Sequence, residues 1–255
     1  MSLVDVISSA ERGRLARLIT RLQDDPEGAD ETLAVEEVTQ KSDAHTVGIS
    51  GVAGAGKSTL ISRMLPVLRG DKLRVVVLAI DPTSEGSQGA LLGDRIRMRD
   101  SYGDEGVFIR SLATRGAPEA LTVALPAIIR ACSYFCDLVM VETAGAGQVD
   151  VGIRRHVDTF VAVVAPLGDA ITLMKSGQTE HAHVVAVNVR RGLEGNDRFV
   201  EQARVILGRD TLEDGWKRRV FALDAKHDEG IEPFIRDGIL TRRDAIDGGG
   251  VGRSA

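Results

Sequence analysis

The stretch Gly51-Val-Ala-Gly-Ala-Gly-Lys-Ser-Thr59 decides the fold class of this chain. It follows the apolar run Val47-Gly-Ile49 and leads into a helix-like segment. A G-x-x-x-x-G-K-S/T pattern between a strand and a helix is typical of a P-loop, because the glycines let backbone N–H groups curve around phosphates. The helix N-terminus adds positive potential. We therefore expect Lys57 to contact the β- and γ-phosphates and Ser58 to bind Mg²⁺. The residues expected to contact the nucleotide here are Gly51, Ala53, Gly54, Ala55, Gly56, Lys57, Ser58 and Thr59.

The composition is that of a soluble globular protein, with 43% hydrophobic and 27% charged residues. The net charge of -5 argues against a nucleic acid or an anionic membrane as partner. No apolar run is long enough to span a bilayer, and Asp5 interrupts the apolar start that a secretory signal would need. We therefore expect a cytoplasmic protein that binds neither nucleic acid nor membrane.

Short apolar strands alternate with helical segments over most of the chain. The strands are continuous Val/Ile/Leu runs, which indicates an α/β fold with a mostly parallel sheet and helices on both faces. Expected strands are Thr46–Ser50, Arg74–Ile80, Val107–Arg110, Leu138–Glu142, Phe160–Ala165, Val184–Asn188 and Arg219–Leu223. Expected helices are Val4–Leu22, Ala29–Thr39, Ser58–Leu68, Pro118–Tyr134, Gly168–Thr179 and Arg198–Leu207. The predicted domains are an N-terminal helical extension (1–42), a P-loop domain (43–240) and a disordered, glycine-rich tail (241–255).

Three acidic residues lie at or just beyond strand ends, where ligands collect in a parallel α/β sheet. Asp81 and Glu142 close two expected strands, and Asp94 lies in the segment between them. Together with Ser58, these carboxylates are the expected Mg²⁺ ligands.

The segment Glu142-Thr-Ala-Gly145 has the position of a strand-plus-glycine element that senses a γ-phosphate. Gly145 would offer its backbone N–H to that phosphate. Catalysis by Lys57, Glu142 and Gly145 would consist of positioning and charge stabilisation. Arg154 and Arg155 are open to two interpretations, an internal arginine finger or a solvated helix face, of which the second is favoured. Lys175 is either a partner-triggered contact or a surface lysine.

Several longer motifs resemble one family. They are Gly48-Ile-Ser-Gly-Val-Ala-Gly-Ala-Gly-Lys-Ser-Thr59, Asp81-Pro-Thr-Ser84, Gly89-Ala-Leu-Leu-Gly-Asp-Arg-Ile-Arg-Met98, Phe108-Ile-Arg-Ser111 and Val141-Glu-Thr-Ala-Gly-Ala-Gly-Gln148. This combination resembles the MeaB/ArgK-type GTPases, the methylmalonyl-CoA mutase-associated GTPase family. Its members are chaperones of adenosylcobalamin-dependent acyl-CoA mutases. The resemblance covers most of residues 10–240.

The resemblance implies a P-loop G-domain of the class that contains signal-recognition and metal-insertion GTPases. It implies Mg²⁺ and GTP or GDP as ligands, and GTP hydrolysis as the reaction. It also implies an adenosylcobalamin-dependent acyl-CoA mutase as partner, whose cofactor loading the protein gates and which it protects or reactivates.

The chain departs from the family's pattern where guanine is read. In the family's Asn-Lys-x-Asp element, the Asp carboxylate accepts two N–H groups of the base. Here Asn188 remains, but Val189 stands in place of the lysine and Arg191 in place of the acid. Because arginine has no acceptor and carries the opposite charge, we expect a weakened guanine preference. Asp224 and Asp197 are candidates for the missing carboxylate.

Further departures concern the later base-contacting element and the chain's end. The family's Ser-Ala appears here as Asp224-Ala225, so the expected base contacts are Asn188, Asp224 and Ala225. Pro166-Leu-Gly-Asp169 is shorter than the family's turn. The chain stops near where the family adds a C-terminal dimerisation arm, which argues against family-style dimerisation, although a homodimer stays an open alternative.

Three other functions stay as alternatives. The first is a nucleotide-binding regulatory module with weak hydrolysis or relaxed base specificity. The second is a metal-insertion GTPase, which His181, His183, Cys132 and Cys136 motivate. The pattern favours half-buried histidines and buried thiols over metal ligands at these positions. The third is a small-molecule kinase, which no acceptor-binding motif supports.

Overall fold

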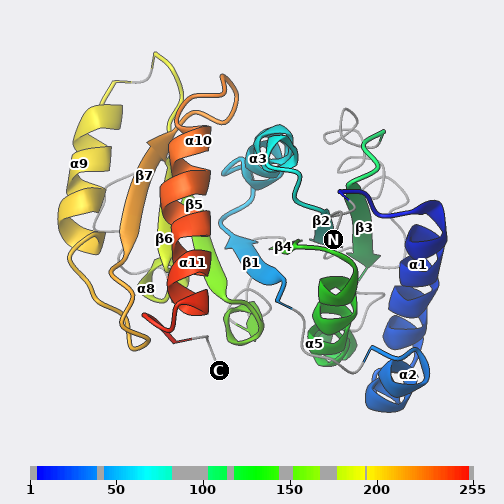
Figure 1. Ribbon diagram of the computed structural model, residues 1–255. Helices are drawn as coiled ribbons and strands as arrows, with labels where there is room; N and C mark the ends of the chain where they lie inside the picture. Colours follow the sequence, from blue (N-terminus) through cyan, green and yellow to red (C-terminus); the bar gives the residue numbers. More distant parts are fainter. Residues whose placement is uncertain are drawn as a thin grey trace. The chain divides into compact units, whose positions relative to one another are not determined.

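The computed structural model describes residues 5–38, 43–81, 103–113, 118–143, 152–166, 177–192 and 194–252. The chain divides into two compact units. The first comprises Met1–Thr46 and Leu65–Glu142, and the second comprises Val47–Met64 and Thr143–Ala255. Within each unit the strands of the described residues pair in parallel and are accompanied by helices, which confirms the expected α/β class (Figure 1).

The first unit holds strands in the order β3-β2-β4 and, beside them, helices that include the N-terminal extension. The strands are β2 (Val75–Asp81), β3 (Val107–Ala113) and β4 (Leu138–Glu142). The helices are α1 (Ser9–Asp24), α2 (Ala29–Val35) and α5 (Pro118–Phe135). β4 is buried along its whole length, as expected of a strand covered on both faces.

Helix α1 begins at a capping box, in which the Ser8 hydroxyl accepts from the Glu11 backbone and the Glu11 carboxylate accepts from the Ser8 backbone. Its apolar face is buried and packs against α5. Its basic side is engaged inside the unit: Arg12 donates to the Asp104 carbonyl, while Arg14 pairs with Glu36. The extension is therefore a packed part of the first unit.

The second unit holds strands in the order β1-β5-β6-β7. They are β1 (His45–Ser50), whose first two residues belong to the first unit, β5 (Thr159–Val164), β6 (Val184–Asn188) and β7 (Arg219–Leu223). The helical elements are α3 (Lys57–Gly70), which continues into the first unit, the 3-10 turn η2 (Arg154–His156), α8 (Gly177–Glu180), α9 (Asn196–Leu207), α10 (Ile231–Pro233), the π-helical η3 (Phe234–Leu240) and α11 (Thr241–Asp247).

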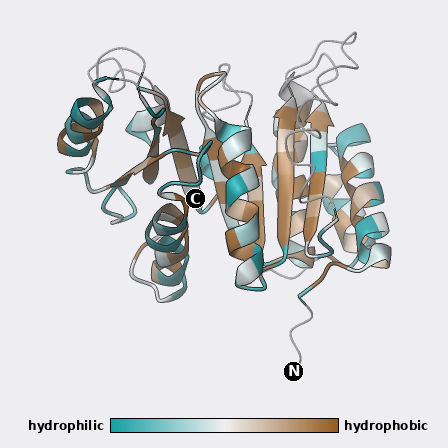
Figure 2. Ribbon diagram, turned by 90° about the horizontal axis from the view of Figure 1, so that it is seen from above, coloured by the Kyte–Doolittle hydropathy of each residue, from teal (hydrophilic) through white to brown (hydrophobic). Residues whose placement is uncertain are grey.

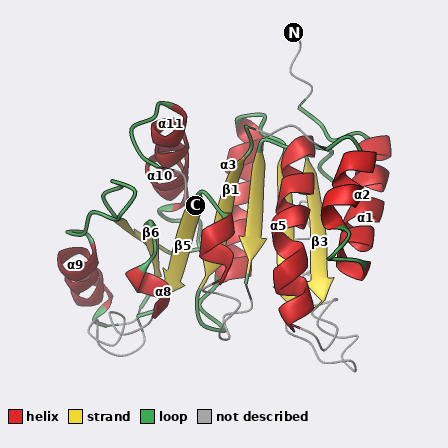
Figure 3. Cartoon of the chain, turned by 90° about the horizontal axis from the view of Figure 1, so that it is seen from below, coloured by secondary structure: helices red, strands yellow, loops and turns green. Residues whose placement is uncertain are grey.

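Hydrophobicity follows this layering. The strands are the most hydrophobic parts of the ribbon in Figure 2, and every residue of β1 and β5 is buried. In Figure 3, α9 and the α10–α11 segment lie on opposite sides of the second unit's strands. Helix α9 packs on β7, and η3 packs on β6 and β7. Because both faces are covered, ligands have access chiefly at the strand ends.

The structure differs from expectation at the C-terminal end. The prediction of a disordered tail is wrong for the residues from Thr241 to Asp247, which form α11, and Arg242 in this helix has no exposed surface. The tail was predicted from the glycines after Asp247, and its composition gives no sign of the contacts that the buried arginine makes. Most of the expected helix Gly168–Thr179 lies outside the described residues, and so do the segments 83–98 and 144–151.

Candidate functional site

The predicted phosphate loop joins the end of β1 to the start of α3. Backbone geometry explains its glycines at two positions. A Cβ on Gly51 would lie 2.2 Å from the Val163 carbonyl oxygen, and a Cβ on Gly56 would lie 2.2 Å from the Asn188 amide nitrogen. Gly56 also has a φ of +95°, which favours glycine. The loop therefore passes close to two neighbouring elements that leave no room for side chains.

Lys57 and Ser58 open helix α3, and both side chains are buried. The Lys57 ammonium donates to the carbonyl oxygens of Gly51 (2.7 Å) and Val52 (3.3 Å). The lysine is thus folded back over the loop that precedes it. Backbone N–H groups at a helix start and a lysine held beside them form a favourable environment for phosphate oxygens.

Asn188, the last residue of β6, joins this loop to the next strand end. Its amide nitrogen donates to the Ala55 carbonyl (2.8 Å), and its amide oxygen accepts from the Ala225 backbone (3.0 Å). Asn188 pairs with Leu223 in the β6–β7 register, so the segments that follow these strands begin side by side. One side chain therefore connects three predicted nucleotide-binding segments of the second unit.

Asp224 follows β7 directly, and its carboxylate is buried. It accepts from the backbone N–H groups of Lys226 (3.0 Å), His227 (3.2 Å) and Arg191 (3.3 Å). It also lies 2.8 Å from Nδ1 of His227, which must carry the hydrogen because a carboxylate only accepts. Burial opposes ionisation, but the hydrogen bonds and charge of His227, with the backbone of Arg191, hold the pKa of Asp224 below its ordinary value. Asp224 is therefore an anion that organises both loops.

A cavity of about 520 Å³ opens between the phosphate loop and these two strand ends. Its volume lies within the range of small-ligand sites. Its lining residues are Gly54, Gly56, Thr59, Asn188, Val189, Arg190, Arg191, Asp224, Lys226 and His227. The structure thus brings three of the predicted phosphate residues, Gly54, Gly56 and Thr59, together with Asn188 and Asp224. Ala225, which follows Asp224, is buried. Sequence reasoning missed Arg190, Lys226 and His227 as lining residues. The one feature of the sequence that could have indicated them is that they lie within three residues of Asn188 or Asp224.

The predicted acids belong to the first unit. Asp81 and Glu142 end β2 and β4, which are neighbours, with Ala79 opposite Glu142. Glu142 is buried. The residues predicted as Mg²⁺ ligands offer carboxylate and hydroxyl oxygens, the donor type that this ion prefers, so they fit it chemically. Asp94 and Gly145 lie outside the described residues. Within the described ranges no group of three or more His, Cys, Asp or Glu side chains gathers around a common point.

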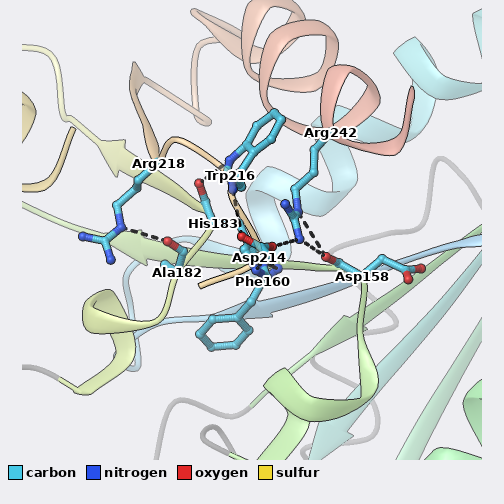
Figure 4. Close-up of polar contacts among 8 residues, drawn as sticks. All are labelled: Asp158, Phe160, Ala182, His183, Asp214, Trp216, Arg218 and Arg242. Carbon is cyan, nitrogen blue, oxygen red and sulfur yellow. Dashed lines mark hydrogen bonds and ion pairs between the residues drawn. The ribbon is translucent and has the colours of Figure 1, made fainter. Parts of the chain in front are cut away.

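Three of the four residues considered for a transition metal, His183, Cys132 and Cys136, are buried, and His181 is half-buried. The Phe160 backbone donates to His183 Nδ1 (2.8 Å), and His183 Nε2 faces an Asp214 carboxylate oxygen at 3.4 Å (Figure 4). Burial, with the nearby Arg242 charge, lowers the pKa of His183 to about 3, so its ring is neutral. Burial raises the pKa of the Cys136 thiol to about 12. The burial and contacts of His183 and Cys136 favour a role in the core over a role as metal ligands.

Arg154 lies in the 3-10 turn η2, and Lys175 lies outside the described residues.

No helix in the part of the chain that the structure describes has the length and hydrophobicity needed to cross a membrane.

Comparison with known proteins assigns this arrangement to a family. A family model described as "Methylmalonyl Co-A mutase-associated GTPase MeaB" matches residues 15–254. A Pyrococcus abyssi protein named "Putative GTPase" is 39% identical over 254 residues, which are 97% of this chain and 77% of that protein. A fused isobutyryl-CoA mutase of Nocardia farcinica is 42% identical over 209 residues, which are 80% of this chain but 19% of that protein.

Solved structures give the same fold. A structure described as LAO/AO transport system kinase has a TM-score of 0.63 and 26% identity, covering 96% of this chain and 79% of that chain. The hydrogenase maturation factor HypB from Archaeoglobus fulgidus has a TM-score of 0.55, covering 90% of this chain and 99% of that chain. Its identity is 17%, so this likeness concerns the fold alone.

Proposed function

Since this chain belongs to the family of methylmalonyl-CoA mutase-associated GTPases (MeaB), we propose that it binds and hydrolyses GTP with Mg²⁺ as a G-protein chaperone of an adenosylcobalamin-dependent acyl-CoA mutase. In this role it gates cofactor loading and protects or reactivates the mutase. The partner proposal is supported by fused isobutyryl-CoA mutases, in which a segment similar to this chain is part of the same polypeptide as the mutase.

The observation that carries the nucleotide proposal is the cavity lined by Asn188, whose side chain connects the phosphate loop to the segment after β7. Its phosphate end is formed by Gly54, Gly56 and Thr59, and its other end by the segments after β6 and β7. A nucleotide would place its phosphates against the loop and the start of α3, and its base between the two segments. The Asn188 bonds to Ala55 and Ala225 would keep those ends in register.

In the proposed reaction, Lys57 exchanges its bonds to the loop carbonyls for bonds to phosphate oxygens. Its charge then neutralises the charge that develops on the γ-phosphate, which is the main form of catalysis in phosphoryl transfer. Gly145 would contribute a backbone N–H to the same phosphate. Ser58, Asp81, Asp94 and Glu142 are the proposed Mg²⁺ ligands, and the ion would supply further charge neutralisation.

A lysine substitution tests the nucleotide site. Lys57→Ala is expected to weaken GDP binding at least about thirtyfold, because truncating a buried charged partner costs about 2 kcal/mol or more. GTP hydrolysis should fall with it. Binding is measured by titration calorimetry, and urea unfolding checks that the variant folds. Lys217→Ala, at an exposed lysine outside the cavity lining, is the matched control. Equal GDP affinity in both variants would remove Lys57 from the site.

A regulatory module with relaxed base choice is the second candidate. It is favoured by Arg191, which lines the cavity where an acid would read guanine. Efficient, guanine-selective hydrolysis would exclude it. The metal-insertion and kinase alternatives have no such observation in their favour.

A further inference from the structure

The base-facing end of the cavity has an unusual balance of hydrogen-bonding groups. Asp224 is the only acid among its lining residues in the part of the chain that the structure describes. A carboxylate offers about four acceptor positions. One oxygen accepts from the backbones of Lys226 and His227, and the other accepts from the Arg191 backbone and the His227 ring. Asp224 is therefore saturated by the protein and is not open to a base.

Three of the residues that line this end have cationic side chains, which are hydrogen-bond donors. Arg190, Arg191 and Lys226 all contribute to the lining, and none of them carries an acceptor. Glu229 pairs with the Arg191 guanidinium and lines a neighbouring cavity of about 380 Å³. It is absent from the lining of the nucleotide-sized cavity. Arg191 lines both cavities, so its pair with Glu229 lies where they adjoin. The charged side chains at this end, other than the saturated Asp224, are donors that complement oxygen acceptors.

Purine bases differ on the edge that such groups would meet. Guanine presents two donors there, N1–H and the 2-amino group, and both need acceptors. Hypoxanthine lacks the amino group, and xanthine carries a carbonyl oxygen in its place. A buried donor left without an acceptor costs about 1–3 kcal/mol, whereas a carbonyl facing an arginine gains a charge-assisted bond.

We propose that the base end of this cavity selects a purine nucleotide by its carbonyl oxygens, with Arg191 as the specificity-determining residue, so that xanthine nucleotides bind at least as well as guanine nucleotides. The 2-amino group of guanine then contributes nothing to affinity. This inference rests on the proposed nucleotide-binding function and specifies the substrate class of the same site.

The test compares GDP, IDP, XDP and ADP by titration calorimetry with Mg²⁺ at neutral pH. Diphosphates are used because they are not hydrolysed. IDP is expected to bind within fivefold of GDP, XDP at least as tightly as GDP, and ADP at least fivefold more weakly than XDP. The proposal is overturned if GDP binds fivefold or more tightly than IDP, if GDP binds more tightly than XDP, or if ADP comes within fivefold of XDP.

A charge reversal tests the residue assignment. Arg191→Asp restores an acceptor and is expected to shift the GDP-to-XDP affinity ratio toward GDP by about tenfold or more, which corresponds to about 1.4 kcal/mol. The matched control is Arg198→Asp on the exposed side of α9, which makes the same charge change outside the cavity lining. The control ratio should stay at the wild-type value. An unchanged ratio in Arg191→Asp, or an equal shift in both variants, would overturn the role of Arg191.

The outcomes also separate this inference from the function on which it rests. Binding of diphosphates with guanine preferred removes only the inference. If none of the four diphosphates binds, the proposed function fails together with it.

Discussion

Asp224 links two loops of the second unit through hydrogen bonds that come from Arg191 on one side and from Lys226 and His227 on the other. Its side chain is only 3% exposed, whereas that of the nearby Asp228 is 58% exposed and pairs with Arg63. The stability of the fold should therefore depend more on the charge of Asp224 than on the charge of Asp228. A buried carboxylate with several donors stabilises the fold as an anion, while an exposed ion pair contributes little.

This contrast predicts a pH-dependent stability difference. Asp224→Asn removes the anion and is expected to lower the free energy of unfolding by about 1–3 kcal/mol at pH 7. The folded-state pKa of Asp224 lies below its ordinary value, so its stabilisation is full above the unfolded pKa of about 3.9 and fades as pH falls through the folded pKa. Urea unfolding of wild type and variant between about pH 7 and 2 should therefore show a difference that stays constant above about pH 4 and narrows below it.

Asp228→Asn is the matched control, because asparagine tolerates the left-handed backbone at this position, where φ is +60°. Its effect should stay within about 1 kcal/mol at every pH. A pH-independent loss in Asp224→Asn, or an equal loss in both variants, would contradict a stabilising charge at Asp224.

Helix α11 is attached to the rest of the second unit through one of its own residues, the buried Arg242. Arg242 donates to the Asp158 carbonyl (2.9 Å) and to the Asp214 carboxylate (2.6 Å), and its guanidinium lies over the Trp216 ring (Figure 4). The Trp216 indole donates in turn to the His183 carbonyl, which precedes β6. The C-terminal helix is thereby attached to the amino ends of β5 and β6, at the ends of these strands that lie away from the cavity.

Removing this arginine should loosen the second unit. Arg242→Ala is expected to lower the free energy of unfolding by about 3–5 kcal/mol, because breaking a buried ion pair leaves its partner uncompensated. Arg243→Ala, whose side chain pairs with the adjacent Asp244 near the surface, should change it by less than about 1 kcal/mol. Urea unfolding measures both variants. Equal, small effects would show that α11 does not need the buried pair.

The helices and strands show how far the sequence could predict this fold. β4, β6 and β7 have the expected bounds, because each is a short apolar run with clear breaks on both sides. Helix α11 was missed because the contacts of Arg242 come from residues 28 and 84 positions away, which no local pattern reveals. Asp224 was proposed as a base-reading acid, but its saturation by neighbouring donors depends on the geometry of two loops.

At the level of the whole chain, the family relationship covers both the nucleotide-binding unit and the N-terminal helices. The family model begins at residue 15, within α1, and the Pyrococcus abyssi relative aligns over 97% of this chain. In the fused mutases, by contrast, the similar segment is a small part of a much longer protein. Under the proposed function this protein binds a mutase, and a nucleotide can control that step only if it favours one conformation of this protein.

The proposed partnership therefore predicts complex formation that depends on the nucleotide. Candidate acyl-CoA mutase subunits are co-purified with this protein in GDP or in a nonhydrolysable GTP analogue. The mutase affinity should differ between the two nucleotides by about fivefold or more, within the usual range of coupling between sites. At nucleotide concentrations that saturate only the wild type, Lys57→Ala should reduce the difference without abolishing mutase binding, because it weakens nucleotide binding and leaves the partner surface. Absence of a complex under either nucleotide would refute the chaperone role for the mutases tested. It would leave nucleotide binding intact, since the cavity and its contacts are formed by this chain alone.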